Sequence, residues 1–348
     1  MENIRLNVAL LRKKVPNLTS AAKSVGLRPA TVSNLSTGKI PVGRAEVRTI
    51  VALAELAGCS LDELILRGES VEMIQTGIKT LDLFAPISKG GTVGLVARPG
   101  MGQLVVLAEM LHRLKREGYV TILINPKGDH PELEDVLQDI DFVTNNIEET
   151  EKIIQREVIG KDYVLTADRS YVISGEMFTL QESFDAKGAG RVTTFLIDLK
   201  GEAVDEDLPY GPLDTLWQFD ADLAARHKYP AINPIYSTSS ILEGSYLDPI
   251  HHSIQQRAQK LLRRYRELRA IVNVHGLERL PASESQIYTQ GEKLEAYLTQ
   301  PFYVAEAYTG KKGENVKLQE TLSDVKKILD NPSSISNAEE LNFIGSIK

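Results

Sequence analysis

Cysteine is almost absent from this sequence, and so is any long hydrophobic run. The 348 residues include a single cysteine, Cys59, so no disulfide can form within the chain, which fits a reducing cytoplasm. No apolar stretch approaches the roughly 20 residues that a membrane-spanning helix needs. The N-terminus has a polar start and no signal-peptide core. These absences predict a cytoplasmic protein with no membrane partner.

The charge of the chain is unevenly distributed. The formal net charge is −7, yet residues 1–48 contain nine basic and two acidic residues, a charge of +7 that leaves −14 on the rest. A basic segment joined to an acidic body favours a polyanionic partner for the basic segment alone. Together with the motif in residues 18–39, this asymmetry predicts that residues 1–48 bind double-stranded DNA.

A phosphate-binding loop is present in outline, but the two side chains that hold phosphate and metal are missing. An apolar strand at residues 92–97 leads into a Gly-rich turn and then into a helix with apolar periodicity. A working loop follows the pattern G-x-x-x-x-G-K-[ST], in which the Lys neutralises phosphate and the hydroxyl holds Mg²⁺. Here Ala97 replaces the first Gly, Gln103 the Lys, and Leu104 the hydroxyl residue. The loop residues that a nucleotide could still contact are Arg98, Gly100, Gly102, Gln103 and Leu104.

Residues 18–39 have the pattern of two short helices joined by a tight turn. Ala22 is a small residue where two helices must approach, and Gly26 permits the left-handed backbone of the turn. Val32 and Leu35 are expected to face inward from the second helix. The spacing therefore predicts a helix-turn-helix near the N-terminus.

This segment resembles the helix-turn-helix of phage repressors of the Cro/Xre type, and residues 52–64 resemble the fourth and fifth helices of that family. The resemblance implies a small all-α domain of five short helices whose second motif helix reads the major groove. Carried over residue by residue, it predicts base contacts at Arg28, Ala30, Thr31, Ser33 and Asn34, and phosphate contacts at Lys23, Lys39 and Arg44. A helical bundle that docks onto another protein is the alternative.

Three segments of the remaining chain resemble the beta subunit of rotary ATP synthase. They are Thr76–Gly91, Lys228–Ser240 and, most strongly, Gln300–Gly310, and the resemblance spans about residues 72–348 with a poorly matching middle. The family's N-terminal β-barrel is absent, and the helix-turn-helix stands in its place. The resemblance implies a RecA-like P-loop domain followed by a C-terminal helical domain.

The pattern between these segments is typical of an α/β fold. Strand-like runs at Tyr119–Ile124, Tyr163–Ala167 and Val192–Ile197 alternate with polar helical stretches, which predicts a mainly parallel sheet covered on both faces. From Pro249 onward the pattern is helical. The predicted divisions are a helix-turn-helix domain at 1–67, a linker at 68–72, a degenerate nucleotide-binding domain at 73–248 and a helical domain at 249–348.

The resemblance also implies which catalytic parts are lost. ATP hydrolysis in this family uses the loop Lys and Thr, a Glu that positions water, an Asp at a strand end and an Arg from a neighbouring subunit. Asp129 falls at the Glu position, Asp168 at the strand-end Asp, and the Arg position is Ser240. Because catalysis of this kind depends on electrostatic positioning, we expect a pseudo-ATPase with no metal site.

An adenine pocket could persist without the phosphate machinery. The family's aromatic pair around adenine matches Tyr229 and Tyr308, and Phe302 lies in the same pattern. Stacking does not need the loop Lys, so ATP or ADP could bind without catalysis. The alternative is that these rings belong to the core.

Two other features favour ordinary structural roles. His251 and His252 have no Cys, Asp or Glu cluster at ligand spacing, so a solvated helix start is expected rather than a metal site. Basic residues between Arg257 and Arg269 form a run on one helix, for which a solvated face is expected over a nucleic-acid contact.

The sequence as a whole predicts a DNA-binding transcriptional regulator whose inactive ATP-synthase-beta-like body supplies oligomerisation, as a dimer or ring, and adenine-nucleotide sensing. Two other functions remain open. One is a protein-interaction or scaffold module derived from an ATPase subunit. The other is a slow ATPase or remodelling ring.

Overall fold

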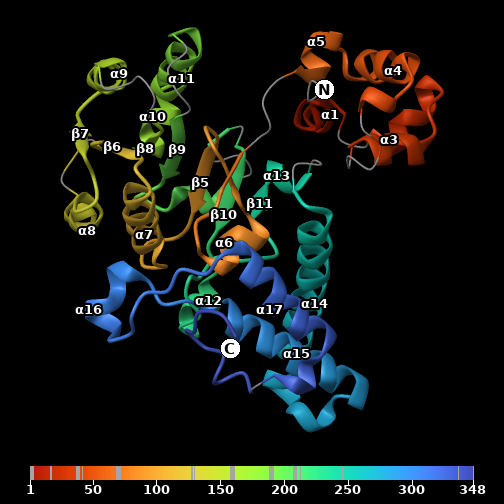
Figure 1. Cartoon of the computed structure of the whole chain (residues 1–348), viewed down its shortest axis with the longest axis vertical. Coiled ribbons are helices and arrows are strands. Elements are labelled where there is room, and N and C mark those ends of the chain that lie inside the picture. Colours follow the sequence, from red (N-terminus) through yellow and green to blue (C-terminus); the bar gives the residue numbers. More distant parts are fainter. Residues whose placement is uncertain are drawn as a thin grey trace. The chain divides into compact units, whose positions relative to one another are not determined.

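The computed structural model divides into two compact units (Figure 1). One contains Met1–Glu72 with Ser240–His252, and the other contains Met73–Ser239 with Ser253–Lys348. The structure describes residues 4–15, 18–36, 40, 42–67, 72–126, 128, 130–156, 161–187, 192–206, 210–211, 213–243, 247–335 and 337–347. The proposed linker at 68–72 lies outside the described residues except for Glu72.

The first unit is built mainly from short helices around one small core. Leu11, Leu53 and Leu64 are fully buried in this core. Its α-helices are α1 (Val8–Lys14), α2 (Leu18–Ala21), α3 (Pro29–Ser36), α4 (Val47–Ala57) and α5 (Leu61–Leu64), with 3-10 helices η1 (Ala22–Val25) and η2 (Val42–Arg44). A short antiparallel pair of strands, β1 (Ile4–Leu6) and β2 (Ile65–Arg67), joins the two ends of this segment. Sequence periodicity did not predict these two strands, because three residues are too few to show alternation.

The turn between η1 and α3 has the backbone that the sequence predicts. Gly26 caps η1 in the left-handed region, with φ of 72°. Ala22 is fully buried, and Val32 and Leu35 are 1% and 3% exposed. The inward positions of these three side chains are confirmed.

A seven-stranded sheet forms the centre of the second unit. Its strand order is β11-β10-β5-β9-β8-β6-β7, and all neighbouring pairs are parallel except β10 with β11. The strands are β5 (Thr92–Val96), β6 (Val120–Ile124), β7 (Phe142–Thr144), β8 (Tyr163–Asp168), β9 (Val192–Ile197), β10 (Thr215–Gln218) and β11 (Thr238–Ser239). Before this sheet, β3 (Met73–Ile74) pairs antiparallel with β4 (Ile87–Ser88). The predicted α/β fold with a mainly parallel sheet is confirmed.

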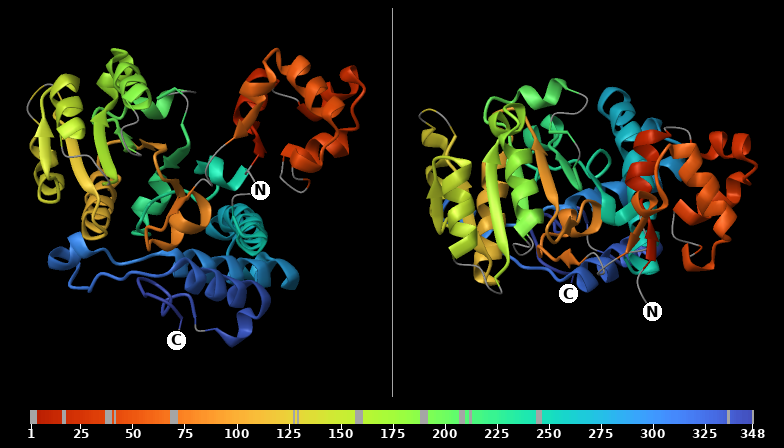
Figure 2. Two further views of the ribbon diagram at one scale, coloured as in Figure 1. Left: turned by 45° about the horizontal axis from the view of Figure 1, so that its top comes forward. Right: turned by 90° about the horizontal axis from the view of Figure 1, so that it is seen from above.

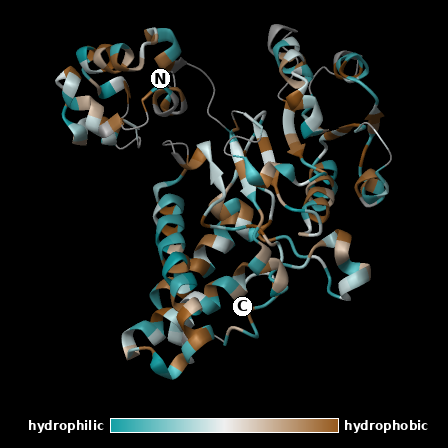
Figure 3. Ribbon diagram, turned by 180° about the vertical axis from the view of Figure 1, so that it is seen from behind, coloured by the Kyte–Doolittle hydropathy of each residue, from teal (hydrophilic) through white to brown (hydrophobic). Residues whose placement is uncertain are grey.

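Helices cover both faces of the sheet. Successive residues of β8 face opposite sides, because Val164 belongs to one buried cluster and Leu165 to another. The first cluster includes side chains of α7 (Gln103–Arg116), and the second includes side chains of α9, α10 and α11. The helices in this part are α6 (Lys79–Phe84), α7, α8 (Glu134–Leu137), α9 (Ile147–Arg156), α10 (Arg169–Ile173), α11 (Glu176–Lys187) and α12 (Ala221–Ala225), with η3 (Pro131–Leu133) and η4 (Glu202–Asp205). Figure 3 shows hydrophobic residues concentrated along the strands.

The C-terminal part is helical, as predicted, and its long helices gather on one side of the sheet (Figure 2). Leu83 and Phe84 of α6 belong to the buried cluster of these helices, whereas Leu81 belongs to a cluster of the sheet. Helix α6 therefore ties the sheet to the C-terminal helices. These elements are α13 (Ser240–Glu243), α14 (Pro249–His275), α15 (Ala282–Leu298), α16 (Glu306–Thr309) and α17 (Leu318–Asp330), with η5 (Leu277–Arg279), η6 (Tyr303–Ala305) and η7 (Pro332–Ser334).

Candidate functional site: a phosphate-binding loop without its lysine

The Gly-rich loop between β5 and α7 retains the backbone shape of a phosphate-binding loop. Gly100 and Gly102 both have φ of 84°, a conformation that side-chain-bearing residues rarely adopt. Gly102 is the N-cap of α7, so the helix begins directly at the loop. Backbone N–H groups at such a helix start form an anion site in other proteins.

Gln103, at the position of the missing Lys, is folded into the protein. Its side chain is 5% exposed, and its Nε2 donates a hydrogen bond to the carbonyl of Asp198 at 3.3 Å. Its Oε1 is buried and finds no hydrogen-bond partner among the described residues. Leu104 is partly buried and packs against the main core of the sheet. Neither position offers a cation to a phosphate or a hydroxyl group to a metal ion.

The segment after β9, residues 198–205, packs directly onto this loop. A Cβ at Gly201 would lie 2.5 Å from Cδ of Pro99, so the two backbones are in close contact. Arg98 Nη2 pairs with Asp205 Oδ1 at 2.9 Å, and both side chains are more than half exposed. The carboxylate of Asp198 accepts hydrogen bonds from the backbone N–H groups of Lys200 and Ala203. We call residues 198–205 the connector.

The packing of the connector against the phosphate-binding loop was not predicted from the sequence. The available signal was an Asp at the end of an apolar strand, since β9 ends at Ile197 and Asp198 follows. Two strands, β8 and β9, lead into an Asp in this way, and the strand-end role was assigned from the sequence to Asp168 of β8 rather than to Asp198. Strand order decides which of them neighbours the loop, because β9 lies between β5 and β8.

The carboxylate of Asp168 accepts hydrogen bonds from nearby backbone N–H groups. One of its carboxylate oxygens accepts the Ser170 N–H at 2.9 Å and caps α10, and the other accepts the Leu199 N–H at 3.3 Å. It therefore joins β8 to the connector. Asp129 lies outside the described residues. The assignment of catalytic-type roles to these two positions stays a prediction.

The three aromatic residues of the predicted adenine pocket occupy different environments. Tyr229 is partly buried, and its Cε1 would lie 3.6 Å from a Cβ at Gly102, so its ring is next to the loop. Phe302 is 5% exposed and belongs to a buried cluster of the sheet. Tyr308 is 83% exposed on α16 and is not a core residue.

The predicted DNA-contact residues lie on the first unit, and most of them are exposed. Arg28, Ala30 and Ser33 are exposed at the start and on one face of α3, with Thr31 and Asn34 partly exposed. Lys23 and Arg44 are exposed as well, whereas Lys39 lies outside the described residues. The structure thus presents the polar face of α3 together with nearby cations.

Comparisons with known proteins show what the body of the chain is similar to. Residues 242–336 match the family described as the C-terminal domain of V and A type ATP synthase. The structure is similar to NeqB, described as a unique ATP synthase subunit from Nanoarcheaum equitans, with a TM-score of 0.60 and 15% sequence identity over 77% of this chain and 78% of that chain. The body has an ATP-synthase-subunit-like fold. The sequence resemblance is confirmed for this body, and the helix-turn-helix assignment stays a prediction.

Two further expectations concern α14 of the ATP-synthase-like body. His251 is 1% exposed, so the expected solvated start of this helix is wrong for His251. Most of the basic run is neutralised by ion pairs: Arg257 with Asp330, Arg264 with Glu267 and Glu284, Arg266 with Asp220, and Arg269 with Asp222. Among the described residues, no group of three or more His, Cys, Asp and Glu could hold a metal ion, and no helix could cross a membrane.

Proposed function

We propose that the chain is a catalytically inactive, ATP-synthase-subunit-like module that acts by assembling with protein partners or with copies of itself. The observation that carries this proposal is the placement of Gln103. At the position of the phosphate-binding lysine, it is 5% exposed and hydrogen-bonded to the connector. The body has the fold of a protein that works as a subunit, and its loop lacks what turnover requires.

The missing groups each carry a large share of phosphoryl-transfer catalysis. Loss of one arginine finger alone costs roughly 10³-fold or more in rate, and here Ser240 occupies that position. Loss of the lysine and of the metal ligand removes most of the remaining charge stabilisation. Arg98 is the cation within the loop, but it is paired with Asp205 and cannot replace a metal-binding oxygen.

Adenine nucleotide binding without hydrolysis fits the same proposal. Tyr229 is partly buried beside Gly102, and Tyr308 is exposed; stacking of a base on either ring does not need the loop lysine. Phosphate binding is expected to be weak, because the nearby cation is shared with a carboxylate. ATP and ADP would then act as ligands that alter assembly, not as substrates.

Two measurements on the full chain test this proposal. We expect sedimentation to show an oligomer without nucleotide, and we expect no ATP turnover above background. Gln103→Lys/Leu104→Thr, which restores the two missing side chains in the same loop, is the matched comparison for turnover. Turnover by the unmodified protein that Gln103→Ala abolishes would support a slow ATPase or remodelling ring, and a strictly monomeric protein would contradict the assembly role.

We propose as a second candidate that the first unit binds double-stranded DNA, which would make the chain a transcriptional regulator. The favouring observation is the exposed face of α3, which includes Ser33, together with the exposed Arg28 just before the helix and after the left-handed turn at Gly26. An arginine at this place suits a guanine edge, and a partly exposed Asn34 suits an adenine edge.

The DNA-binding candidate is tested by gel shift over a range of salt concentrations. Arg28→Ala/Asn34→Ala is expected to remove sequence preference, whereas Arg44→Ala is expected to weaken binding to all sequences and to reduce the salt dependence. Binding that is equally strong for every sequence and unchanged by Arg28→Ala/Asn34→Ala would exclude the regulator role. In that case the first unit would be a protein-docking adaptor.

A further inference from the structure

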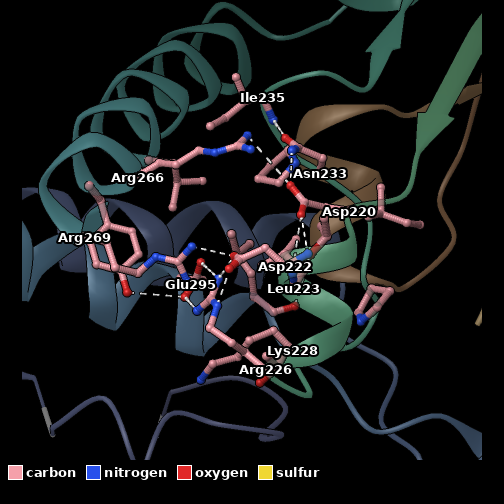
Figure 4. Close-up of a pocket in the computed structure, with 18 residues that line it drawn as sticks. Asp220, Asp222, Leu223, Arg226, Lys228, Asn233, Ile235, Arg266, Arg269 and Glu295 are labelled. Carbon is pink, nitrogen blue, oxygen red and sulfur yellow. Dashed lines mark hydrogen bonds and ion pairs between the residues drawn. The ribbon is translucent and has the colours of Figure 1, made fainter. Parts of the chain in front are cut away.

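A polar pocket lies away from the phosphate-binding loop, where α12 and the chain after it meet α14 and α15 (Figure 4). Its volume is about 50 Å³, enough for a few water molecules or one small ion. Leu262, Tyr265 and Leu298 supply apolar walls. We call it the arginine pocket, after Arg226, Arg266 and Arg269, which line it.

Guanidinium and carboxylate groups converge in this pocket. Arg226 makes paired contacts with Glu295, at 2.5 and 2.8 Å, and with Asp222, at 2.8 and 3.1 Å. Arg269 Nη2 contacts the same Asp222 oxygen at 2.5 Å. Burial alone would raise the pKa of the Asp222 carboxyl, but the two guanidinium groups hold this pKa below its ordinary value. All of these contacts to Asp222 are made to its Oδ2.

Not every hydrogen-bond donor of the Arg269 guanidinium group finds a partner among the described residues. The side chain of Arg269 is 13% exposed, and its Nη1 is buried without a hydrogen-bond partner among the described residues. A buried donor on a charged group is costly to leave unpaired, so a partner that the protein does not supply is expected at this position. A pocket wide enough for an ion adjoins the same guanidinium.

The hydrogen-bond donors of the pocket favour an oxyanion over water. Four cationic side chains line it, Arg226, Lys228, Arg266 and Arg269, against three carboxylates, Asp220, Asp222 and Glu295. Lys228 also interacts with the carboxylate of Glu292 outside the lining, so the three guanidinium groups, not an excess of charge, favour the anion. The planar fork of a guanidinium matches the oxygens of a carboxylate or phosphate group.

We propose that the arginine pocket is a binding site for one small oxyanion, of the carboxylate or phosphate class, held by the guanidinium group of Arg269. The pocket is too small for a nucleotide, since ligand sites for drug-sized molecules occupy roughly 300–1,000 Å³. Its walls come from α12, α14 and α15, so a bound anion would stabilise the junction between the sheet and the C-terminal helices. This site is independent of the function proposed above.

The test is thermal unfolding of the full chain at constant ionic strength, with chloride replaced by up to 20 mM sodium phosphate in one arm and sodium acetate in the other. Unmodified protein is expected to show a saturable rise in Tm in at least one arm, because a ligand that binds only the folded state stabilises it. The arm that responds identifies the class of anion. General salt effects on stability are not saturable in this range and affect every variant equally.

Arg269→Gln is expected to weaken anion binding at least about tenfold, the loss that follows removal of a hydrogen bond to a charged group. Arg264→Gln is the matched control, because it changes an arginine of the same helix that does not line the pocket, and its anion response should equal that of the unmodified protein. If Arg269→Gln does not fold, Arg269→Lys keeps the charge but removes the fork and should still weaken binding. No saturable response in either arm, or an equal response in the Arg269 variants, would overturn the proposal.

Discussion

Lys79 is a fully buried lysine that holds the C-terminal segment. Its Nζ donates to the carbonyls of Ile344 and Gly345, at 2.8 and 3.2 Å, and lies 4.2 Å from the centre of the Tyr297 ring. Burial lowers the pKa of Lys79 to about 7, against the opposing effect of the Asp324 and Glu314 carboxylates. The neutral amine can still donate both hydrogen bonds, so the contact survives deprotonation.

This pKa predicts that stability increases with pH. Between pH 7 and the unfolded pKa of Lys79, near 10.5, the unfolded chain binds more protons than the folded chain, so the free energy of unfolding rises with pH. We expect a gain of about 2 kcal/mol between pH 7 and pH 9 in the unmodified protein relative to Lys79→Met. Urea unfolding of both proteins at the two pH values measures this difference. Parallel stability curves would show that Lys79 does not titrate in this range.

Among the elements, the connector makes the contacts that hold one side of the phosphate-binding loop. Its contacts reach the loop from one side, through Asp198 to Gln103, Gly201 to Pro99, and Asp205 to Arg98. The buried hydroxyl of Tyr210, just beyond the connector, donates to the carbonyl of Leu95 in β5. Because β5 and β9 are adjacent, their carboxyl ends bring the loop and the connector together.

The close contact between connector and loop can be tested with a pair of glycines. Gly201 and Gly100 have similar backbone conformations, with φ of 74° and 84°, so alanine costs about 1 kcal/mol at each for backbone strain. Only Gly201→Ala also places a Cβ against Pro99, whereas nothing lies within 4 Å of a Cβ at Gly100. We expect Gly201→Ala to destabilise the protein by roughly 1–3 kcal/mol more than Gly100→Ala, as overpacking does. Equal losses in urea unfolding would mean that the connector moves freely away from the loop.

For the whole molecule, the buried clusters show that the first unit is a separate folding element. The cluster that contains Leu11, Leu53 and Leu64 includes residues up to Ile65, and the clusters of the body begin at Met73. The formal charge follows the same division, with +7 on residues 1–48. A basic unit with its own core can therefore act on a polyanion without the chemistry of the body.

Removing residues 1–67 tests this separation. We expect the remaining chain to keep the oligomeric state of the full protein and to lose DNA binding, because the body retains all of its own buried clusters. Sedimentation and gel shift on the full and shortened chains measure the two properties. A shortened chain that becomes monomeric would assign assembly to the first unit.

Much of the fold could be predicted from short-range pattern. Strand-like runs located β6, β8 and β9, and the helical pattern from Pro249 onward located the C-terminal helices, because these elements bury apolar side chains over several successive residues or turns. The strands β1 and β2 were missed, since their pairing joins residues about sixty positions apart and leaves no local signal. His251 was placed in solvent for a similar reason, because its burial depends on what packs against the start of α14.

The sequence by itself determined which chemistry is absent from the loop. The identities of Gln103 and Leu104 remove the lysine charge and the hydroxyl ligand in any conformation, because a neutral amide carries no charge and an alkyl group has no oxygen. Only the tertiary structure decided which side chains lie in contact with the loop and with one another. Strand order placed Asp198 rather than Asp168 beside the loop. Helix packing brought Arg269 onto the carboxylate of Asp222 beside Arg226. Such contacts depend on distances in space between residues that are far apart in the chain.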